Sequence, residues 1–521
     1  MSKQREKNVI MVVLDTHRFD RMGSYGYARP TTPNLDSLAE ESLFFERAIA
    51  PGQWTIPSHA SLFSGEPPAV HMTVQPDDAL PKEFKTLAAR LSVAGLQTTG
   101  YCNNPLVGIL QNGFKRGFDQ FYNYCGVVPS TPQKEKDDLW KPMRKLWTKY
   151  TQILRRLSYP IQNTFASPNE FFLAALRPLF VPLWTQAANF KGMTERSIRD
   201  TSNHVRKIGQ AGTGSNFIFL NLMETHMPYN PPDAFLKQFA PYFHESPEAQ
   251  HFMQGFNRKA MQWLIPLVKP FTEVESSTLS DLYDAEVAYQ DHLLSQLIEE
   301  LNSPYHREHS MVIFLADHGE MLGEHGFMGH GFGVYEPLIR VPLFIRFPEL
   351  DQPQRIERRV SITQLFYTVL DYFGFESVPM PYADAVDVGC QSLLQIKNFK
   401  GCPQSPLITE AYPPENALRI MRNHHPGLIE QYQAENTRRA VYNDNEKMIV
   451  VEGLTNVLYN LAGDPDETQP YSEEVRIGAL AKELDTYLDL AATRRKGLLN
   501  RKISLKDEII QQRLRDLGYL E

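Results

Sequence analysis

The chain has 521 residues, of which 42% are hydrophobic and 22% charged, so it can bury a large core. Its length fits one large domain with an appendage, or two or three domains. The formal net charge of −8 gives no general attraction to nucleic acid or anionic lipid, so no nucleic-acid partner is expected. No window offers about 18 uninterrupted apolar residues, which argues against a membrane-spanning helix.

The N-terminus is charged and then continues into one short apolar run, from Val9 to Leu14. This run is too short for a secretion signal and lacks a small-residue cleavage site, so it predicts a buried strand and a cytoplasmic protein. The cysteines show no metal-binding spacing, and a structural disulfide is rare in the cytosol, so buried thiols are expected. The four are Cys102, Cys125, Cys390 and Cys402.

Short apolar runs separated by helical patterns indicate the fold class. Runs at 8–15, 215–224, 310–318 and 341–347 are typical of parallel strands covered on both faces, and helices are expected at 33–48, 83–95 and 277–301. This alternation predicts an α/β fold with a mostly parallel sheet. Functional side chains gather beyond the carboxyl ends of such strands, and three of these strands end in polar residues.

A segment at about 126–205 interrupts the alternation. Within it, LWKPMRKLWTKYTQILRRL has apolar residues at helical spacing and six Lys or Arg without an acidic residue. One interpretation is an insertion whose apolar face packs on the body. The alternative is a basic, aromatic surface at 139–184 that rests on a membrane or covers a lipid-like substrate.

A smaller C-terminal α+β subdomain is expected at 404–521, after a catalytic domain at 1–403. Segments 438–453 and 456–469 are typical of strands in a small second sheet, and DPDET is a turn signal. The last segment, 507–521, is amphipathic and is expected to dock on the body as a helix.

A constellation of polar residues at the strand ends predicts a metal site. Asp15 follows one strand and Asp317 with His318 follows another, while WTIPSHASLFSG supplies the hydroxyl of Thr55 or Ser58. Two carboxylates, an imidazole and a hydroxyl suit Zn²⁺, Mn²⁺, Mg²⁺ or Ca²⁺. A metal lowers the pKa of a hydroxyl, which then acts as a nucleophile near neutral pH. Taken alone, Asp followed by His fits a helix cap beside a solvated histidine equally well.

Two loops strengthen the functional interpretation. FLADHGEMLGEHGFMGHG contains five glycines after Asp317-His318 and two further histidines, His325 and His330, in a polar segment that is poor material for a core helix. METHMPYNPP places His226 between a strand and Pro-rich chain that fixes the backbone, although an ordinary surface histidine fits this pattern too.

In this order, the motifs resemble the sulfatase branch of the alkaline phosphatase superfamily. They are LDT…RFD, WTIPSHASLFSG, ETHMPY and ADHGEMLGEHG…GHG…YEPLIRVPLFIR. The likeness covers about 8–125 and 213–350 and reaches the LYNLAGDPDET turn, but not the 126–205 insertion or most of a second variable region at about 235–275. It implies an alkaline-phosphatase-like, mostly parallel central sheet flanked by helices.

The resemblance also implies roles for single residues. Asp15, Asp317 and His318 match the metal ligands of the family, and Thr55 stands where the family places a nucleophile that also binds the metal. His226 matches the histidine that contacts the sulfuryl or phosphoryl oxygens of the substrate.

Further positions match less closely. Asn103, or equally Asn104, falls where sulfatases carry a substrate-binding lysine, and His59 replaces an arginine that helps to position the nucleophile. His59 is therefore assigned either a hydrogen bond at the metal site or a purely structural role. The second acidic ligand of sulfatases is Thr16 here, which argues against a sulfatase-like Ca²⁺ site and favours Mn²⁺ or Zn²⁺ beside His318.

The nucleophile position departs from sulfatases in a way that changes the chemistry. Sulfatases have C-x-P-S-R, whose cysteine becomes formylglycine, whereas this chain reads TIPSH. Threonine cannot form the aldehyde that expels sulfate, so no formylglycine is expected. A phosphorylated threonine can be cleared by in-line attack of water or an alcohol at phosphorus. Nucleotide pyrophosphatases and the phosphoethanolamine and phosphoglycerol transferases are similar in using a threonine there. The transferases also resemble this chain in having a histidine at the position of His330.

These features predict a metal-dependent hydrolase of phosphate esters, either phosphodiesters or phosphonate monoesters. The substrate is expected to be a small-molecule or lipid-like ester. Three alternatives stay open: a sulfatase that works without formylglycine, a transferase that passes the phosphoryl group to an alcohol or lipid, and a catalytically silent binding module. Assembly into a homo-oligomer also stays open.

Overall fold

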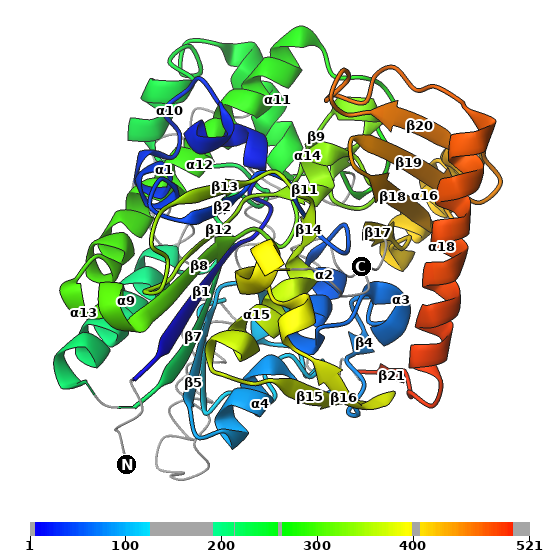
Figure 1. Ribbon diagram of the computed structural model, residues 1–521. Helices are drawn as coiled ribbons and strands as arrows, with labels where there is room; N and C mark the ends of the chain where they lie inside the picture. The colour runs from blue at the N-terminus through cyan, green and yellow to red at the C-terminus, as the bar shows by residue number, and fades with distance from the viewer. Residues whose placement is uncertain (1–5, 126–190, 213, 259–262, 399–406, 504–521) are drawn as a thin grey trace, which may run out of the picture.

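A computed structural model describes residues 6–125, 191–212, 214–258, 263–398 and 407–503 (Figure 1). The basic segment at 139–184 and the expected terminal helix at 507–521 both lie outside these residues. The second variable region, at about 235–275, is described except at 259–262.

A large mixed sheet forms the centre of the molecule, with the strand order β13-β2-β12-β8-β1-β7-β5-β6. The strand β1 pairs in parallel with β7 and with β8, which confirms three of the expected strands. Their bounds are β1 Asn8–Leu14, β7 Asn216–Leu222 and β8 Ser310–Leu315. The other strands are β2 Leu43–Phe45, β5 Gln97–Cys102, β6 Gln120–Asn123, β12 Leu343–Arg346 and β13 Gln354–Ile356.

Two expectations about this sheet are wrong in detail. The run at 341–347 contains β12, but this strand is antiparallel to β8, because an apolar run indicates burial and not direction. The helix expected at 33–48 ends at Ala39, as α1 Pro33–Ala39, and is followed by β2. The Ser42 hydroxyl donates to the carbonyl of Leu38 near the helix end, and the next apolar residues enter the sheet.

Helices cover both faces of the large sheet (Figure 1). Successive side chains of β1 point to opposite faces, so Val9 and Met11 pack in one core while Ile10 and Val12 pack in another. The first core includes residues of α2 Thr55–Ser64, α4 Leu87–Val93 and α15 Leu365–Tyr372. The second includes residues of α1, α9 Thr194–Ala211 and α12 Glu273–Leu301. The helices expected at 83–95 and 277–301 correspond to α4 and α12.

A four-stranded antiparallel sheet follows in the C-terminal part, as the strand patterns predict. Its strands are β17 Leu407–Ala411, β18 Arg438–Asn443, β19 Glu446–Val451 and β20 Val457–Asn460, and α18 Glu474–Arg495 packs beside them. The hydroxyl of Thr409 donates to the carbonyl of Ala50 at 2.6 Å, and Ile408 shares a core with the large sheet. The division at 403/404 stays a prediction.

The remaining helices and strands are short, and they connect the two sheets or lie beside them. The helices are α3 Pro68–His71, α5 Pro105–Gly108, α10 Asp233–Phe239, α11 Pro247–Arg258, α13 Pro304–His309, α14 Glu336–Ile339, α16 Glu415–His424 and α17 Pro426–Tyr432. The strands are β3 Ala48–Ile49, β4 Asp78–Ala79, β9 Met321–Leu322, β10 Met328–Gly329, β11 Arg340–Val341, β14 Val360–Ser361, β15 Ser377–Met380, β16 Ala383–Asp387 and β21 Arg501–Lys502.

One cysteine departs from expectation. Cys102 and Cys125 are buried thiols, but Cys390 is disulfide-bonded, which the spacing of cysteines along a sequence does not reveal. Disulfides persist mainly in oxidising compartments, so this bond weighs against the predicted cytoplasmic location, which stays a prediction. Across the described ranges, the helices are all too short or too polar to cross a bilayer.

Candidate active site

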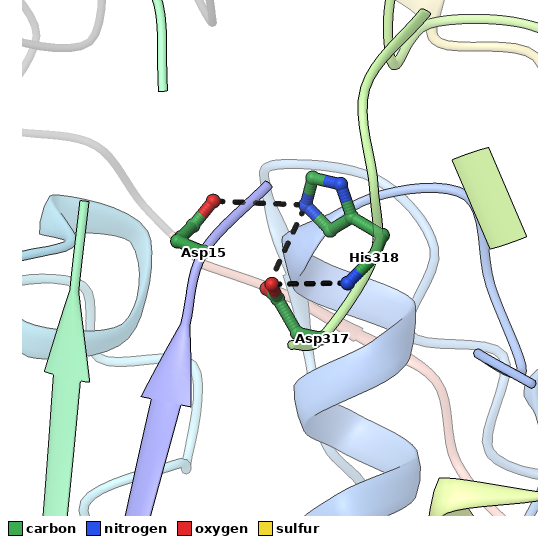
Figure 2. Close-up of side chains that lie close together, drawn as sticks. All are labelled: Asp15, Asp317 and His318. Atoms are coloured by element: carbon green, nitrogen blue, oxygen red, sulfur yellow. Dashed lines mark hydrogen bonds and ion pairs between the residues drawn. The ribbon is translucent and has the colours of Figure 1, made fainter. Parts of the chain in front are cut away.

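Asp15, Asp317 and His318 meet at the carboxyl ends of two neighbouring parallel strands (Figure 2). Asp15 follows β1 directly, and Asp317 and His318 come just after β8. The Nε2 atom of His318 lies 3.8 Å from Asp15 Oδ1 and 3.6 Å from Asp317 Oδ2. All three side chains are fully buried, and one ligand atom from each lies within 4.8 Å of the others.

This donor set fits a divalent cation. The buried oxygen Asp15 Oδ1 accepts no hydrogen bond from the described residues. The contacts of Asp317 Oδ2 are longer ones, to His59 Nδ1 at 3.3 Å and His318 Nε2 at 3.6 Å. The Nδ1 atom of His318 lies 2.9 Å from the carbonyl of Gly319, so Nδ1 carries the hydrogen and the Nε2 lone pair faces the carboxylates. Buried carboxylate oxygens without a partner are unfavourable, and a cation between the three groups would compensate them.

The electrostatics of the three groups agree with that assignment. Burial and the neighbouring Asp317 carboxylate raise the pKa of Asp15. Burial also acts to raise the pKa of Asp317, but His318 and His59 outweigh it and lower the pKa overall. Burial lowers the pKa of His318 to about 4, so its lone pair is available at neutral pH.

Thr55 brings its hydroxyl to the same place. It is the first residue of α2, and its Oγ1 lies 3.4 Å from His318 Nε2. The N-terminus of a helix carries a partial positive charge, which stabilises an ionised hydroxyl there. The Ser58 hydroxyl instead donates to the carbonyl of Gly52 at 3.1 Å. Of these two candidate hydroxyls, only that of Thr55 faces the three ligands.

The neighbouring residues Asn103 and Asn104 have different hydrogen-bond partners. Asn104 Nδ2 donates to Asp15 Oδ2 at 2.6 Å and to Thr55 Oγ1 at 3.3 Å. Its Oδ1 accepts from the backbone N–H of Leu106 and caps α5, which fixes the amide. Asn103 Nδ2 donates to Thr194 Oγ1 at 2.9 Å, at the start of α9. The structure therefore places Asn104 in the site and turns the Asn103 amide nitrogen towards α9.

His59 contacts a ligand and not the Thr55 hydroxyl. Its Nδ1 lies 3.3 Å from Asp317 Oδ2 and 3.0 Å from the carbonyl of Thr55, one helical turn earlier. The ring packs beside Phe63, Phe114 and Phe219. This contact is different from both expected roles, because it fits the positioning of Asp317.

His226 and His330 form the other wall of the site. The His330 ring lies 4.8 Å from the His318 ring and 5.0 Å from the His226 ring, centre to centre. His330 Nδ1 lies 2.9 Å from Glu320 Oε1, and its buried Nε2 has no hydrogen-bond partner among the described residues. Burial and the nearby His330 lower the pKa of His226 to about 3, so His226 is neutral at pH 7.

Comparison with known proteins decides the family. The family model described as Sulfatase matches residues 7–375, which is well over half of the chain. The chain belongs to the sulfatase family. It is a hydrolase that acts on ester bonds, and enzymes of this family depend on a metal.

Relatives in this family are distant in sequence. "Uncharacterized sulfatase YidJ" of Escherichia coli is 22% identical over 498 residues, which cover 93% of this chain and 87% of that protein. An arylsulfatase of Clostridium perfringens is 23% identical and is covered over 68% of its length. Arylsulfatase K of the dog is 26% identical over 203 residues, but this match spans only 34% of that protein.

Solved structures with the same fold include two kinds of ester hydrolase. The phosphonate monoester hydrolase of Agrobacterium radiobacter superposes with a TM-score of 0.62 at 17% identity, covering 96% of this chain and 97% of that one. The putative sulfatase yidJ of Bacteroides fragilis superposes with a TM-score of 0.63 at 15% identity, covering 94% and 97%. These likenesses confirm the alkaline-phosphatase-like fold.

Two further residues of this sulfatase-family chain, Glu320 and Arg18, had no predicted role but support the site. Glu320 follows His318 by two residues, and its carboxylate contacts His330 Nδ1. Its place in the glycine-rich loop between the two histidines was the feature of the sequence that could have predicted a role. The buried Arg18 donates to the Glu320 carbonyl at 3.1 Å and to Glu324 Oε1 at 2.6 Å. Thr16 has a φ of 60° and donates to the carbonyl of Asp15, so its hydroxyl does not point at the three ligands.

Proposed function

We propose that this sulfatase-family chain hydrolyses phosphate esters, either phosphodiesters or phosphonate monoesters, with Thr55 as the nucleophile. The observation that carries the proposal is the Thr55 hydroxyl at 3.4 Å from His318 Nε2, where the sulfatase motif has its modified cysteine. A solved relative in fold is named a phosphonate monoester hydrolase, which supports phosphorus as the reacting centre. A small-molecule or lipid-like substrate is part of the proposal, and the cytoplasmic location is kept as a prediction, against which the Cys390 disulfide stands.

Asp15, Asp317 and His318, together with the Thr55 hydroxyl, would hold a divalent cation. The imidazole ligand favours Mn²⁺ or Zn²⁺ over Ca²⁺ or Mg²⁺. When bound, the cation supplies Lewis-acid chemistry, polarising a phosphoryl oxygen and lowering the pKa of the Thr55 hydroxyl.

The residues of the chain then catalyse two successive displacements at phosphorus. Asn104 orients the ionised Thr55 oxygen, which attacks phosphorus in line while the bond from phosphorus to the leaving alcohol breaks. A proton on His330 Nε2 passes to the departing oxygen, while the Nδ1–H of His330 continues to donate its hydrogen bond to Glu320. The Nδ1–H of His226 donates to the carbonyl of Met227 at 2.6 Å, so the neutral ring would contact the bound ester through Nε2, which is a hydrogen-bond acceptor. Water then attacks phosphorus and gives one proton to His330, while the bond from phosphorus to the Thr55 oxygen breaks. A phosphate monoester or a phosphonate is released, and the ionised Thr55 is restored.

A sulfatase that works without formylglycine is the second candidate, because the curated relatives are named sulfatases. A sulfated Thr55 would lack the aldehyde route and would require attack of water at sulfur. The two candidates therefore differ in the atom at which the second displacement occurs.

A panel of aryl esters separates the candidates. We expect bis-p-nitrophenyl phosphate and p-nitrophenyl phenylphosphonate to be turned over at least about 100-fold faster than p-nitrophenyl sulfate, a difference of roughly 2.7 kcal/mol in activation free energy. Thr55→Ala should lower kcat by about 10³-fold or more, whereas Thr55→Ser, which keeps a hydroxyl, should retain measurable turnover. Faster hydrolysis of the sulfate, or wild-type turnover by Thr55→Ala, would overturn the proposal.

A further inference from the structure

A cavity lies between the large sheet and the C-terminal sheet. Its volume is ≈ 130 Å³, enough for several water molecules or one small oxyanion. Three arginines line it: Arg47 before β3, Arg340 at the start of β11, and Arg359 just before β14. The exposed Pro465 stands at its rim, so the cavity reaches the surface. In Figure 1, β11 and β14 lie between the two sheets.

The carboxylates of the cavity are already paired with other cations. Glu46 binds Arg355 at 2.9 Å, and Glu336 binds Lys447 at 3.2 Å. Neither Arg355 nor Lys447 lines the cavity. Lys447 is shared with Glu467, and Glu336 Oε2 also lies 3.8 Å from Arg359 Nη1. The three arginines that line the cavity nevertheless outnumber its two carboxylates.

Each arginine has other restraints that hold it in place. Arg47 Nη1 donates to Asn445 Oδ1 at 2.9 Å, and Arg340 Nε donates to a backbone carbonyl at 3.0 Å. Among the described residues, no carboxylate lies within ion-pair distance of either guanidinium. Arg359 stacks on Tyr442, and its nearest carboxylate oxygen, on Glu336, is 3.8 Å away.

One guanidinium nitrogen is buried without a hydrogen bond. The Arg359 side chain is only 8% exposed, and its Nη1 donates to no described acceptor. Burial lowers the pKa of Arg340, and the charges of Arg359 and Arg47 act in the same direction, against the opposing effect of the Glu336 carboxylate. A buried nitrogen that donates no hydrogen bond and has only a 3.8 Å ion pair beside other positive charges would gain from a bound anion.

We infer that this cavity is a second ligand site, which binds a small tetrahedral oxyanion such as phosphate or sulfate. Guanidinium groups match such anions because their paired N–H donors bind two oxygens at once. The site shares no residue with the candidate active site, and the inference does not depend on which ester is hydrolysed.

The cavity wall also contacts the catalytic loop. Pro337 and Leu338, next to Glu336, accept hydrogen bonds from the backbone N–H groups of Glu320 and Gly319 at 3.2 and 2.6 Å. An anion bound to Arg340 and Arg359 would therefore stabilise the position of α14 and, through its hydrogen bonds, that of the loop that carries His318. Binding should raise the thermal stability of the whole chain.

Calorimetric titration of inorganic phosphate into the full-length, metal-loaded protein tests the inference, with sodium chloride at equal ionic strength as the blank. The test variant is Arg47→Gln, because Arg47 makes the fewest structural contacts of the three. The matched control is Arg476→Gln, an exposed arginine paired with Glu446 at 3.7 Å. A parallel titration of Asp317→Asn identifies any phosphate that binds at the active site.

We expect phosphate to bind wild type, Arg476→Gln and Asp317→Asn, and to bind Arg47→Gln at the cavity at least tenfold more weakly. A titration with sulfate in place of phosphate should show the same loss. Binding that is equal in Arg47→Gln and wild type, or binding that disappears only in Asp317→Asn, would assign the anion to the active site and overturn the inference.

Discussion

The hydroxyls of Thr55 and Ser58 lie on one helix three residues apart, yet their contacts differ completely. Thr55 Oγ1 faces His318 and Asn104, whereas the Ser58 hydroxyl donates a hydrogen bond to the carbonyl of Gly52. Position at the helix start therefore decides which of the two hydroxyls reaches the metal ligands. The same holds for Asn104 and its neighbour Asn103.

Removing the carboxylate behind His330 tests the proton-transfer role. Glu320→Gln should lower kcat by roughly 10–100-fold, because partners behind reactive histidines typically contribute that much. The pH profile of kcat should also shift, which a purely structural defect would not produce. Tyr229→Phe, which removes only a 3.4 Å hydrogen bond to the other Glu320 oxygen, is the control and should change kcat less than threefold. An unchanged kcat and pH profile in Glu320→Gln would exclude the role.

Metal removal should destabilise the chain, because Asp15 Oδ1 and Asp317 Oδ2 lose the cation that compensates them. Adding Mn²⁺ or Zn²⁺ to chelated protein at 100 times the dissociation constant should raise the unfolding free energy by about 2.7 kcal/mol. Denaturant unfolding measures this gain. Asp317→Asn should gain much less, and an equal gain in that variant would place the metal elsewhere.

Most of the candidate site was predictable because its members follow recognisable strand ends or motifs. Asp15, Asp317 and His318 come directly after apolar runs, and parallel neighbours bring such ends together. The choice between Asn103 and Asn104 was not predictable, since one residue of register in a turn decides which amide faces Asp15. The 3.3 Å contact of His59 with Asp317 was not predictable either, because it depends on the rotation of α2 about its axis.

At the scale of elements, the catalytic loop is held against α14 with no room for a side chain at Gly319. A Cβ atom there would lie 2.0 Å from the carbonyl oxygen of Pro337, which is backbone and cannot turn aside. The close approach lets the N–H groups of Gly319 and Glu320 reach α14. The residue next to His318 is thus glycine for a steric reason.

Gly319→Ala should therefore lower the unfolding free energy by about 3 kcal/mol, at the upper end of overpacking effects, and reduce activity. Chemical denaturation measures the change. The control is Gly478→Ala in α18, where an added Cβ meets nothing within 4 Å. That variant should gain roughly 0.5–1 kcal/mol, because alanine is the better helix former. Equal effects of the two substitutions would refute the steric explanation.

His71, at the end of α3, makes stability depend on pH. Burial lowers its pKa to about 3 from the unfolded value of 6.5, and its Nδ1 accepts from the N–H of Thr73. As the pH falls, the unfolded chain takes up the proton first. The contribution is complete above pH 6.5 and is lost as the pH falls from 6.5 towards 3. Between pH 7 and pH 5 the loss is about 2 kcal/mol.

Replacing the histidine isolates this effect from other titrating groups. His71→Gln keeps a hydrogen-bonding side chain that does not titrate, so its unfolding free energy should fall by about 2 kcal/mol less than that of wild type between pH 7 and pH 5. Equal pH dependence of wild type and His71→Gln would contradict the assignment.

The fold was predictable where hydrophobic pattern and burial coincide. The run of β1 is buried on both faces and was expected, as were α12 and the C-terminal strands. The direction of β12 was not predictable, because pairing partners and not periodicity set it. The helix expected at 33–48 failed for a related reason, since Leu43 and Phe44 satisfy a helical spacing but are buried in a strand.

At the scale of the whole molecule, a buried charge cluster joins the two sheets. Lys447 on β19 is fully buried and binds Glu467 Oε1 at 2.6 Å and Glu336 Oε1 at 3.2 Å. Glu336 belongs to α14, beside the catalytic loop. Burial raises the pKa of Glu467 to about 7, so Lys447 is needed to keep the cluster compensated.

Lys447→Met removes one member of this cluster and leaves two buried acids. It should lower the unfolding free energy by about 3–5 kcal/mol, as breaking a buried pair does. Arg476→Gln, which breaks an exposed pair with Glu446, should cost less than about 1 kcal/mol. A loss below 1 kcal/mol in Lys447→Met would show that the cluster does not hold the sheets together.

The central claim is that Thr55 becomes covalently bonded to phosphorus during turnover. Rapid acid quenching of the metal-loaded enzyme with bis-p-nitrophenyl phosphate, followed by peptide mass spectrometry, tests it most directly. The account predicts a p-nitrophenylphosphoryl group on Thr55 in wild type and its absence from Thr55→Ala. A quenched enzyme that turns over the ester with Thr55 unmodified, or with the group on another residue, would contradict it.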